Sequence, residues 1–386
     1  MSLTTTAYQT RKAVNFTIFL VIFIVVARIV LGFLGTVKDI LFPPPPPVAN
    51  YLFGEIPPLQ LVAFNSELPI PPEASYSYTL QTIEGTLPRF QPIAPVFMKP
   101  IPAEPKFGAE DLAVALAKNL SFDVKPERVT DTSLRFVDDK FVARVLLMDL
   151  VSRNFILSYD FRQKDPSVLT ASQKTPPNED TAKRESDKFL GDATLFREDF
   201  DTTLTKISYH ELSLTELRKA TSLASAQITR VDYFRKALPN IEYYAKQREG
   251  LKFLPDLPLV TLSPDKGNVY LMLSGRDDKK QRFVEVGYLY WDITRDEYGM
   301  YPLKPIDQAW NELKEKKGYI AALNTSKLTG NDITITDVSL GYLDQQEDPA
   351  VNRYIQPVYI FRGTAEVGFL AYVPALGNTK LPTPAQ

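Results

Sequence analysis

The sequence contains no cysteine and a single histidine, His210. Without cysteine the chain can form no disulfide, no thiolate nucleophile, no cysteine-ligated zinc site and no iron–sulfur centre. With one histidine, histidine-rich metal sites are excluded, and a nucleophile–base triad would depend on that residue alone. His210 lies in the segment ISYHEL, which is typical of a loop or a strand end. We interpret it as a surface or capping residue in preference to a catalytic base.

Neither sign of charge predominates, because 44 basic side chains face 46 acidic ones and the formal charge is −2. Nucleic-acid binding requires an excess of basic groups to neutralise phosphates, so we expect no nucleic-acid partner. The sequence also lacks a glycine-rich phosphate loop and the motifs G-x-S-x-G and H-E-x-x-H. We therefore predict no cofactor, no metal site and no catalytic residues.

A long apolar run is present near the N-terminus, at residues 13–35. About twenty mostly apolar residues at 1.5 Å each are long enough to cross a ~30 Å hydrocarbon core. The run predicts a transmembrane helix in which Phe16, Phe19 and Ile22 contact lipid. Arg28 lies about two-thirds of the way along, where its long stem can reach the nearer interface. These four residues form the predicted membrane anchor.

The basic residues before the run favour a short cytoplasmic N-terminus, residues 1–12, and an extracytoplasmic body at the cell membrane. A cleaved signal peptide ending at Val25-Val26-Ala27 is the competing interpretation. Both interpretations predict that the body lies outside the cytoplasm. Secreted eukaryotic domains of this size usually contain disulfides, so an exported bacterial protein is the more natural source.

The proline run Pro43–Pro47 predicts a stiff polyproline II spacer within a linker at residues 36–72. The remainder mixes strand-like and helix-like patterns, which predicts an α+β body. We expect a first domain at residues 73–250, a second at 251–376 and a loose tail at 377–386.

Each predicted domain contains one amphipathic helix. One is expected over Gly108–Leu120, and the other is expected to begin at Pro305. Both halves have the order strand, helix, then a three-strand meander, which suggests two similar sheet–helix units. The main expected strands are Ser133–Val137, Phe141–Met148, Asn154–Phe161, Asn268–Ser274, Arg282–Ile293, Tyr319–Leu323, Ile333–Tyr342, Tyr354–Phe361 and Val367–Val373.

Two of these strands carry further information. In Ile333–Tyr342 the apolar alternation slips by one residue, which predicts a β-bulge at Thr336-Asp337. Pro357 cannot donate a ladder hydrogen bond, which predicts an edge or interrupted strand. An exposed strand edge can bind a partner by strand addition. Pro357, Val358 and Tyr359 are therefore the predicted partner-docking edge.

The acidic and aromatic clusters are open to a functional and a structural interpretation. Asp344, Glu347 and Asp348 share one loop, but the loop lacks the glycine and the ligand spacing of a calcium site, so we favour a solvated turn. The aromatic cluster is interpreted as core packing in preference to a sugar- or peptide-binding platform. Its members are Tyr288, Tyr290, Trp291, Tyr298, Tyr301 and Trp310.

The C-terminal run carries a resemblance to a family. Its segments, in order, are Tyr301-Pro302-Leu303, Ala309, Leu313, Gly318, Ile333-Thr334-Ile335, Val338-Ser339-Leu340-Gly341-Tyr342, Tyr354-Ile355-Gln356-Pro357-Val358-Tyr359 and Ala371-Tyr372-Val373-Pro374-Ala375. This run resembles the closing domain of Yyc-type regulatory proteins, and PepSY-like domains more broadly. The layout of apolar run, proline spacer and this ending also resembles single-span proteins of candidate-phylum bacteria.

The resemblance implies a membrane-anchored extracytoplasmic module in which a helix packs on an antiparallel sheet. It implies a binding or regulatory role through a protein partner, which is a sensor kinase for the Yyc-type proteins, and it carries no catalytic residues. We therefore expect a non-enzymatic protein-interaction or regulatory module. Its predicted partners are membrane lipid, through the N-terminal helix, and an envelope protein. The alternatives are a structural subunit of a cell-surface assembly and a carboxylate-dependent envelope hydrolase.

Overall fold

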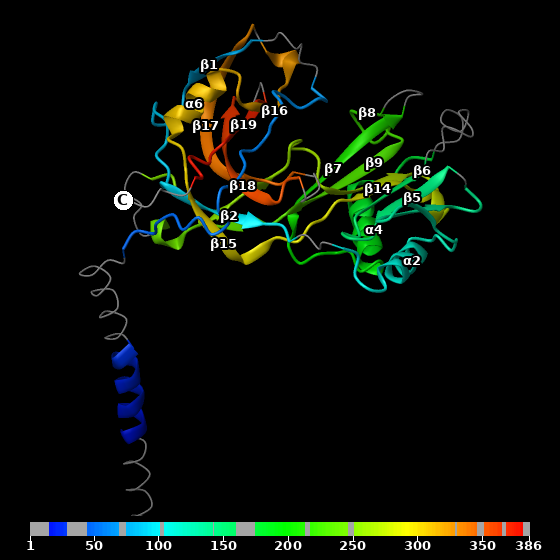
Figure 1. Cartoon of the computed structure of the whole chain (residues 1–386), viewed down its shortest axis with the longest axis horizontal. Coiled ribbons are helices and arrows are strands. Elements are labelled where there is room, and N and C mark those ends of the chain that lie inside the picture. The colour runs from blue at the N-terminus through cyan, green and yellow to red at the C-terminus, as the bar shows by residue number, and fades with distance from the viewer. Residues whose placement is uncertain are drawn as a thin grey trace, which may run out of the picture. The chain divides into compact units, whose positions relative to one another are not determined.

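The computed structural model describes most of the chain (Figure 1). The described residues are 15–28, 45–68, 75–100, 104–141, 143–159, 174–212, 217–245, 251–328, 330–345, 351–364 and 368–380. The chain divides into two units, Met1–Val48 and Ala49–Gln386. The predicted cytoplasmic N-terminus, residues 36–44 and 69–72 of the predicted linker, and residues 381–386 of the predicted tail lie outside the described residues.

In the N-terminal unit, residues 15–28 form a helix with exposed apolar side chains. Phe16 is 67% exposed, Phe19 70% and Ile22 55%. Within the described residues, no helix is both long enough and apolar enough to cross a membrane. The prediction of a transmembrane helix over residues 13–35 is therefore contradicted. The described helix extends only about 21 Å at 1.5 Å per residue, against a hydrocarbon core of ~30 Å.

The body is mostly β-sheet, which corrects the predicted α+β fold of two sheet–helix units. In the described part of the chain, strands form a nine-stranded sheet, an eight-stranded sheet and a two-stranded pair. The main strands expected from the sequence include none between residues 192 and 250, where the structure has two long strands, Phe200–Leu212 and Ile228–Arg235. Sheet membership also crosses residue 250, since strands from both sides of it pair in each large sheet.

The nine-stranded sheet has the order β3-β4-β5-β6-β14-β13-β9-β7-β8, and every neighbouring pair is antiparallel. Its strands are β3 (Glu127–Thr130), β4 (Ser133–Val137), β5 (Arg144–Asp149), β6 (Phe155–Tyr159), β7 (Phe200–Leu212), β8 (Leu217–Lys219), β9 (Ile228–Arg235), β13 (Val269–Ser274) and β14 (Phe283–Tyr288). The one-turn helix α5 (Lys279–Arg282) connects β13 to β14.

One face of this sheet is covered by the helices α2 (Ala109–Asn119) and α4 (Glu179–Asp192) (Figure 1). Helix α2, predicted from the sequence, follows Gly108, whose φ of 75° suits a residue without a side chain. Helix α4 begins at Asn178, whose side chain accepts a hydrogen bond from the Thr181 amide. Alternate strand residues such as Val231 and Leu271 are fully buried against these helices. The intervening residues of each strand therefore occupy the opposite face.

The eight-stranded sheet is built around β17 (Asp332–Leu343) and β18 (Tyr354–Gly363). Its other strands are β1 (Ser77–Leu80), β2 (Ile93–Met98), β12 (Leu259–Val260), β15 (Thr294–Pro302), β16 (Tyr319–Ala322) and β19 (Leu370–Pro374). Helix α6 (Ile306–Lys314), predicted from the sequence, buries Ala309 and Leu313 in its core. The remaining elements are β10 (Leu238–Pro239), β11 (Asp256–Leu257) and the 3₁₀ turns η2 (Glu242–Ala245) and η3 (Thr325–Lys327).

The predicted bulge in β17 is confirmed. Ile335 is opposite Gly363 and Asp337 is opposite Arg362, so Thr336 is an extra residue without a partner on β18. The one-residue slip in apolar alternation has this cause, because a bulge shifts the side-chain phase by one position.

Strand β18 is not an edge, although it contains Pro357. It pairs with β17 on one side and with β19 on the other. The Pro357 carbonyl accepts a hydrogen bond from the Ala375 amide at 3.0 Å. The Ala375 carbonyl, which an amide at position 357 would otherwise satisfy, accepts instead from the Lys304 amide at 2.9 Å. Proline is tolerated at this interior position because the acceptor has another donor.

A buried ion pair ties α2 to the sheet. Arg144 on β5 contacts Asp138 at 3.1 Å, and the two side chains are 3% and 0% exposed. The same guanidinium donates to the Leu120 carbonyl at the C-terminal end of α2 at 2.8 Å.

Replacing Asp138 with alanine leaves this guanidinium buried without its closest counter-charge. We expect Asp138→Ala to lower the free energy of unfolding by about 3–5 kcal/mol. The double variant Asp138→Ala/Arg144→Met should lose less, since it removes the more deeply buried of the two cations that pair with Asp138; the other, Lys280, is 29% exposed. Urea unfolding followed by circular dichroism measures both. A single variant as stable as the wild type would contradict this account.

Candidate functional site

A cleft of about 550 Å³ lies between one side of the eight-stranded sheet and the face of the nine-stranded sheet that α2 and α4 do not cover. Strands β9, β13 and β14 supply its floor. The opposite wall comes from residues 60–67, from β16 and from Asp344 and Gln345, which directly follow β17. The lining residues used below are Phe64, Asn65, Glu67, Arg230, Lys266, Asn268, Tyr270, Met272, Glu285 and Asp344.

The floor follows from strand register. Arg230 on β9 is opposite Met272 on β13, which in turn is opposite Glu285 on β14. Opposed residues in antiparallel strands share one face of the sheet. Asp232 and Tyr270 form the neighbouring row on that face. Val231 and Leu271 face the helices, so the residues that alternate with them along β9 and β13 face the cleft and form its floor.

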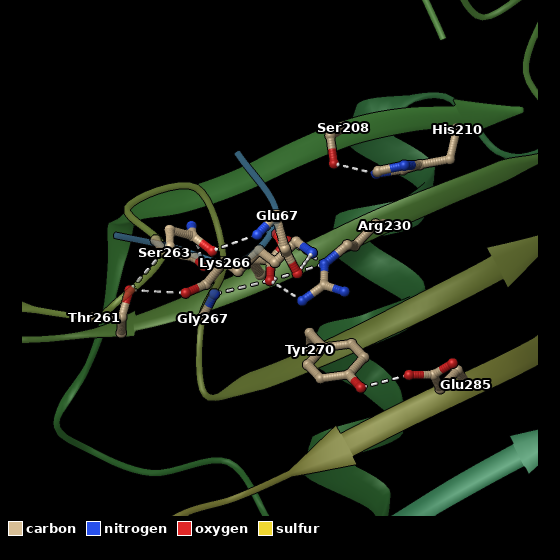
Figure 2. Close-up of polar contacts among 12 residues, drawn as sticks. Glu67, Ser208, His210, Arg230, Thr261, Ser263, Lys266, Gly267, Tyr270 and Glu285 are labelled. Carbon is tan, nitrogen blue, oxygen red and sulfur yellow. Dashed lines mark hydrogen bonds and ion pairs between the residues drawn. The ribbon is translucent and has the colours of Figure 1, made fainter. Parts of the chain in front are cut away.

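A polar chain crosses the floor (Figure 2). The Arg230 guanidinium donates to both carboxylate oxygens of Asp232, at 2.7–3.0 Å. Its central carbon lies 3.9 Å from the centre of the Tyr270 ring. The Tyr270 hydroxyl donates to the Glu285 carboxylate. Burial and the Glu285 charge raise the pKa of Tyr270, so it remains a neutral donor.

Glycine makes the Tyr270 position possible. Gly287 on β14 is directly opposite Tyr270, and a β-carbon at position 287 would lie 2.3 Å from the Tyr270 ring. Real β-carbons do not approach another atom so closely, so only glycine allows the ring to lie over β14. The ring is thereby held between the strand backbone and the Arg230 guanidinium.

Residues 60–67 of the opposite wall are held by contacts at Ala63, Asn65 and Glu67. The Asn65 amide donates to the Ile320 carbonyl at 2.9 Å, and the Ile320 amide donates to the Ala63 carbonyl at 3.1 Å. The Asn65 side chain donates to the Ser263 hydroxyl at 2.9 Å. Glu67 pairs with Lys266 at 2.6 Å (Figure 2). These contacts attach the segment to β16 and to the loop before β13.

Asp344 belongs to the acidic loop considered as a calcium site. Its carboxylate contacts Lys99 at 2.9 Å and Arg235 at 3.5 Å, and it is almost fully buried. Residues 346–350 lie outside the described residues. No group of three potential metal ligands occurs in the described part of the chain. Asp344 is the counter-charge of two buried cations.

His210 is half-buried near the end of β7, with its Nε2 atom 2.9 Å from the Ser208 hydroxyl (Figure 2). Burial and, next, the positive charge of Arg230 lower the pKa of His210 from 6.5 to about 4. The ring is therefore neutral at neutral pH and a weak base. A serine–histidine pair of this kind is poorly suited to activate a nucleophile.

The predicted docking residues lie elsewhere. Pro357, Val358 and Tyr359 are in the interior of the eight-stranded sheet, and Val358 and Tyr359 are at most 1% exposed. They offer no free backbone edge to a partner. The aromatic cluster is core only in part, since Tyr298 is 41% exposed and Trp291 is only partly buried. Tyr288 and Tyr301 are buried, and Trp310 packs against Phe361.

Sequence reasoning missed Arg230, Tyr270 and Glu285 as site residues. The signal was present in the segment QITRVDYFR, where charged Arg230 and Asp232 alternate with apolar Val231 and Tyr233. Such alternation indicates a strand with one apolar and one polar face. It does not show which other strands lie beside it, and the cleft depends on those neighbours.

Comparison of this chain with protein-family models, with curated proteins and with solved structures finds no match.

The lowered pKa of His210 predicts a pH dependence of stability. Between pH 6.5 and about 4 the unfolded chain binds a proton at His210 that the folded chain does not. Stability should therefore fall as pH decreases through this window. The decrease should be shallower in His210→Gln, which keeps a hydrogen-bonding group but does not titrate. Urea unfolding across the pH range measures it. Identical slopes for the two proteins would contradict the assignment.

Proposed function

We propose that this chain is a non-enzymatic interaction module that binds an extended peptide segment of a partner protein in the cleft. The observation that carries the proposal is a free strand edge beside a polar floor. The envelope location and regulatory role implied by the sequence remain part of the proposal, which does not depend on a membrane-spanning helix.

The free edge belongs to Phe64. Because Ala63 and Asn65 direct their main-chain groups toward Ile320, the amide and carbonyl of Phe64 face away from β16. Neither group has a main-chain partner among the described residues. Phe64 also lines the cleft. A peptide strand can pair with such an edge through its backbone and place alternate side chains in an adjoining pocket.

The floor matches an extended chain in length. Asn268, Tyr270 and Met272 share one face along β13, and four residues of strand extend about 13 Å at ~3.3 Å per residue. An extended peptide of about four residues covers the same distance. A compact small molecule would fill only part of it.

The charges of the cleft favour binding over chemistry. Arg230 is neutralised by Asp232, Lys266 by Glu67, and Asp344 by Lys99. Paired in this way, they are not poised for proton transfer. His210 is neutral and weakly basic. Hydrogen-bonding side chains, an aromatic ring and a free edge are the groups that remain for recognition.

The exposed apolar side chains of residues 15–28 indicate that this helix contacts a second apolar surface besides the peptide-binding cleft. Phe16 and Phe19 enter no core among the described residues, and exposed apolar groups of this kind favour a lipid or protein surface. We propose that this helix associates with membrane lipid, which would place the cleft near envelope proteins.

A phage library of random dodecapeptides, selected on the immobilised full-length chain, tests the peptide-binding function. We expect enrichment of a family of related sequences. Ser66→Trp should abolish their binding, because Ser66 lines the cleft, is exposed and forms no hydrogen bond in the described part of the chain. The matched control is Ser222→Trp, at an exposed position outside the cleft.

Enrichment of no family would contradict the peptide-binding function, and equal binding by wild type and Ser66→Trp would place it outside the cleft. Mass spectrometry of the enriched peptides after incubation tests the non-enzymatic part. Intact peptides are expected, and cleaved ones would contradict it.

A further inference from the structure

One carboxylate that lines the cleft, Glu285, forms no ion pair within the described residues, although the charge of Arg230 interacts with it at longer range. Three acidic side chains line the cleft, and the other two, Glu67 and Asp344, are in ion pairs. The one hydrogen bond of Glu285 within the described residues comes from the neutral Tyr270 hydroxyl. Glu285 is only partly exposed, so its charge is incompletely solvated.

A second acceptor in the cleft is also unfilled. The side-chain oxygen of Asn268 is buried and has no hydrogen-bond partner in the described structure, and the residue is 8% exposed. Its amide nitrogen points toward the Asp344 carbonyl at 3.5 Å, which fixes the oxygen on the other side of the group. A buried acceptor without a donor destabilises the folded chain, because the loss of its hydrogen bond to water is not compensated. The oxygen has less than 1 Å² of accessible surface, so a donor in the cleft reaches it, and removes this penalty, once the Asn268 side chain rotates toward the cleft.

The cations of the cleft are already occupied. Arg230 uses its guanidinium on Asp232 and on the Tyr270 ring, and Lys266 contacts Glu67. An anionic ligand would place a further negative charge beside Asp232 and Glu67, which already neutralise these two cations. A cationic ligand meets an unpaired carboxylate without displacing any group. Charge complementarity therefore favours a cation.

The two unfilled acceptors lie at opposite ends of the floor. Asn268 precedes β13, whereas Glu285 is opposite Met272, four residues further along the strand. At ~3.3 Å per residue the separation along the strand is about 13 Å. A single amine cannot reach both. A peptide can, with a backbone amide at one end and a long basic side chain at the other.

We infer that the bound peptide carries a lysine or arginine whose cationic group pairs with Glu285, while a peptide amide donates to the Asn268 side-chain oxygen. This inference rests on the proposed peptide-binding function and adds the chemistry of the partner. Lysine and arginine both have a stem long enough to cross the Met272 surface and place the charge at Glu285.

The peptides enriched on the wild-type chain provide the test. They should share lysine or arginine at one fixed position. Synthetic versions with norleucine there should bind about tenfold more weakly to the wild type, as expected for loss of one charge-assisted contact. Isothermal titration calorimetry measures both affinities. Enriched peptides without a fixed basic residue would overturn the inference and leave the peptide-binding function intact.

Variants locate the interaction. Glu285→Gln retains an acceptor for Tyr270, and it should bind the basic and norleucine peptides equally. Glu297→Gln, an exposed carboxylate outside the cleft, should retain the tenfold preference. Asn268→Leu should weaken both peptides by a similar factor, since it removes a backbone contact. Thermal unfolding of each variant verifies folding. A tenfold preference that survives in folded Glu285→Gln would overturn the assignment.

Competition with Nα-acetyl-lysine methylamide tests whether the cleft binds a peptide or any small amine. We expect this compound to compete with the enriched peptide only at much higher concentration, because it makes no contact along the floor. Competition at concentrations equal to those of the peptide itself would show that the cleft is a site for a small amine.

Discussion

The cleft depends on the buried contact between Arg230 and Asp232. The two residues are two positions apart on β9, and their side chains are 7% and 1% exposed. Asp232 also accepts a hydrogen bond from the Gly267 amide at 2.9 Å, which fixes the loop before β13. That loop supplies Lys266 and Ser263, to which the opposite wall is attached. One carboxylate thus orients the floor cation and positions the wall.

Burying the Arg230–Asp232 pair costs free energy, because both charges lose water. A buried carboxylate is costly to desolvate, and burial raises the pKa of Asp232 despite the opposing effect of Arg230. Replacement by packed apolar residues would serve stability equally well. We interpret the retained polar row as a feature of recognition, because it forms the floor of the cleft beside the free edge of Phe64.

Part of this structure could be predicted from the sequence. Helix α2 and helix α6 have apolar stripes and clear ends, and the bulge at Thr336 leaves a direct trace in the alternation. The sheet order could not be predicted, because strands such as β2 and β18 pair across more than 250 residues of sequence. Local patterns contain no information on such partners. Pro357 misled the reasoning because a distant backbone group, the Lys304 amide, replaces its missing donor.

The same limit applies to the site. The alternation of Arg230 and Asp232 with apolar residues indicates a polar sheet face, but only the fold brings Glu285 and residues 60–67 to it. The expected mode of binding, strand addition, remains in the proposal, whereas the expected edge at Pro357 is replaced by that at Phe64. The free edge at Phe64 arises from one isolated bridge to Ile320, which no periodicity in the sequence reveals.

Hydrogen exchange at the Phe64 amide, measured by mass spectrometry with and without a bound enriched peptide, tests the central claim most directly. Strand addition predicts that this amide becomes protected at least about tenfold when the peptide binds, because it then donates to the peptide backbone. Saturating peptide that leaves exchange at Phe64 unchanged would contradict strand addition at this edge.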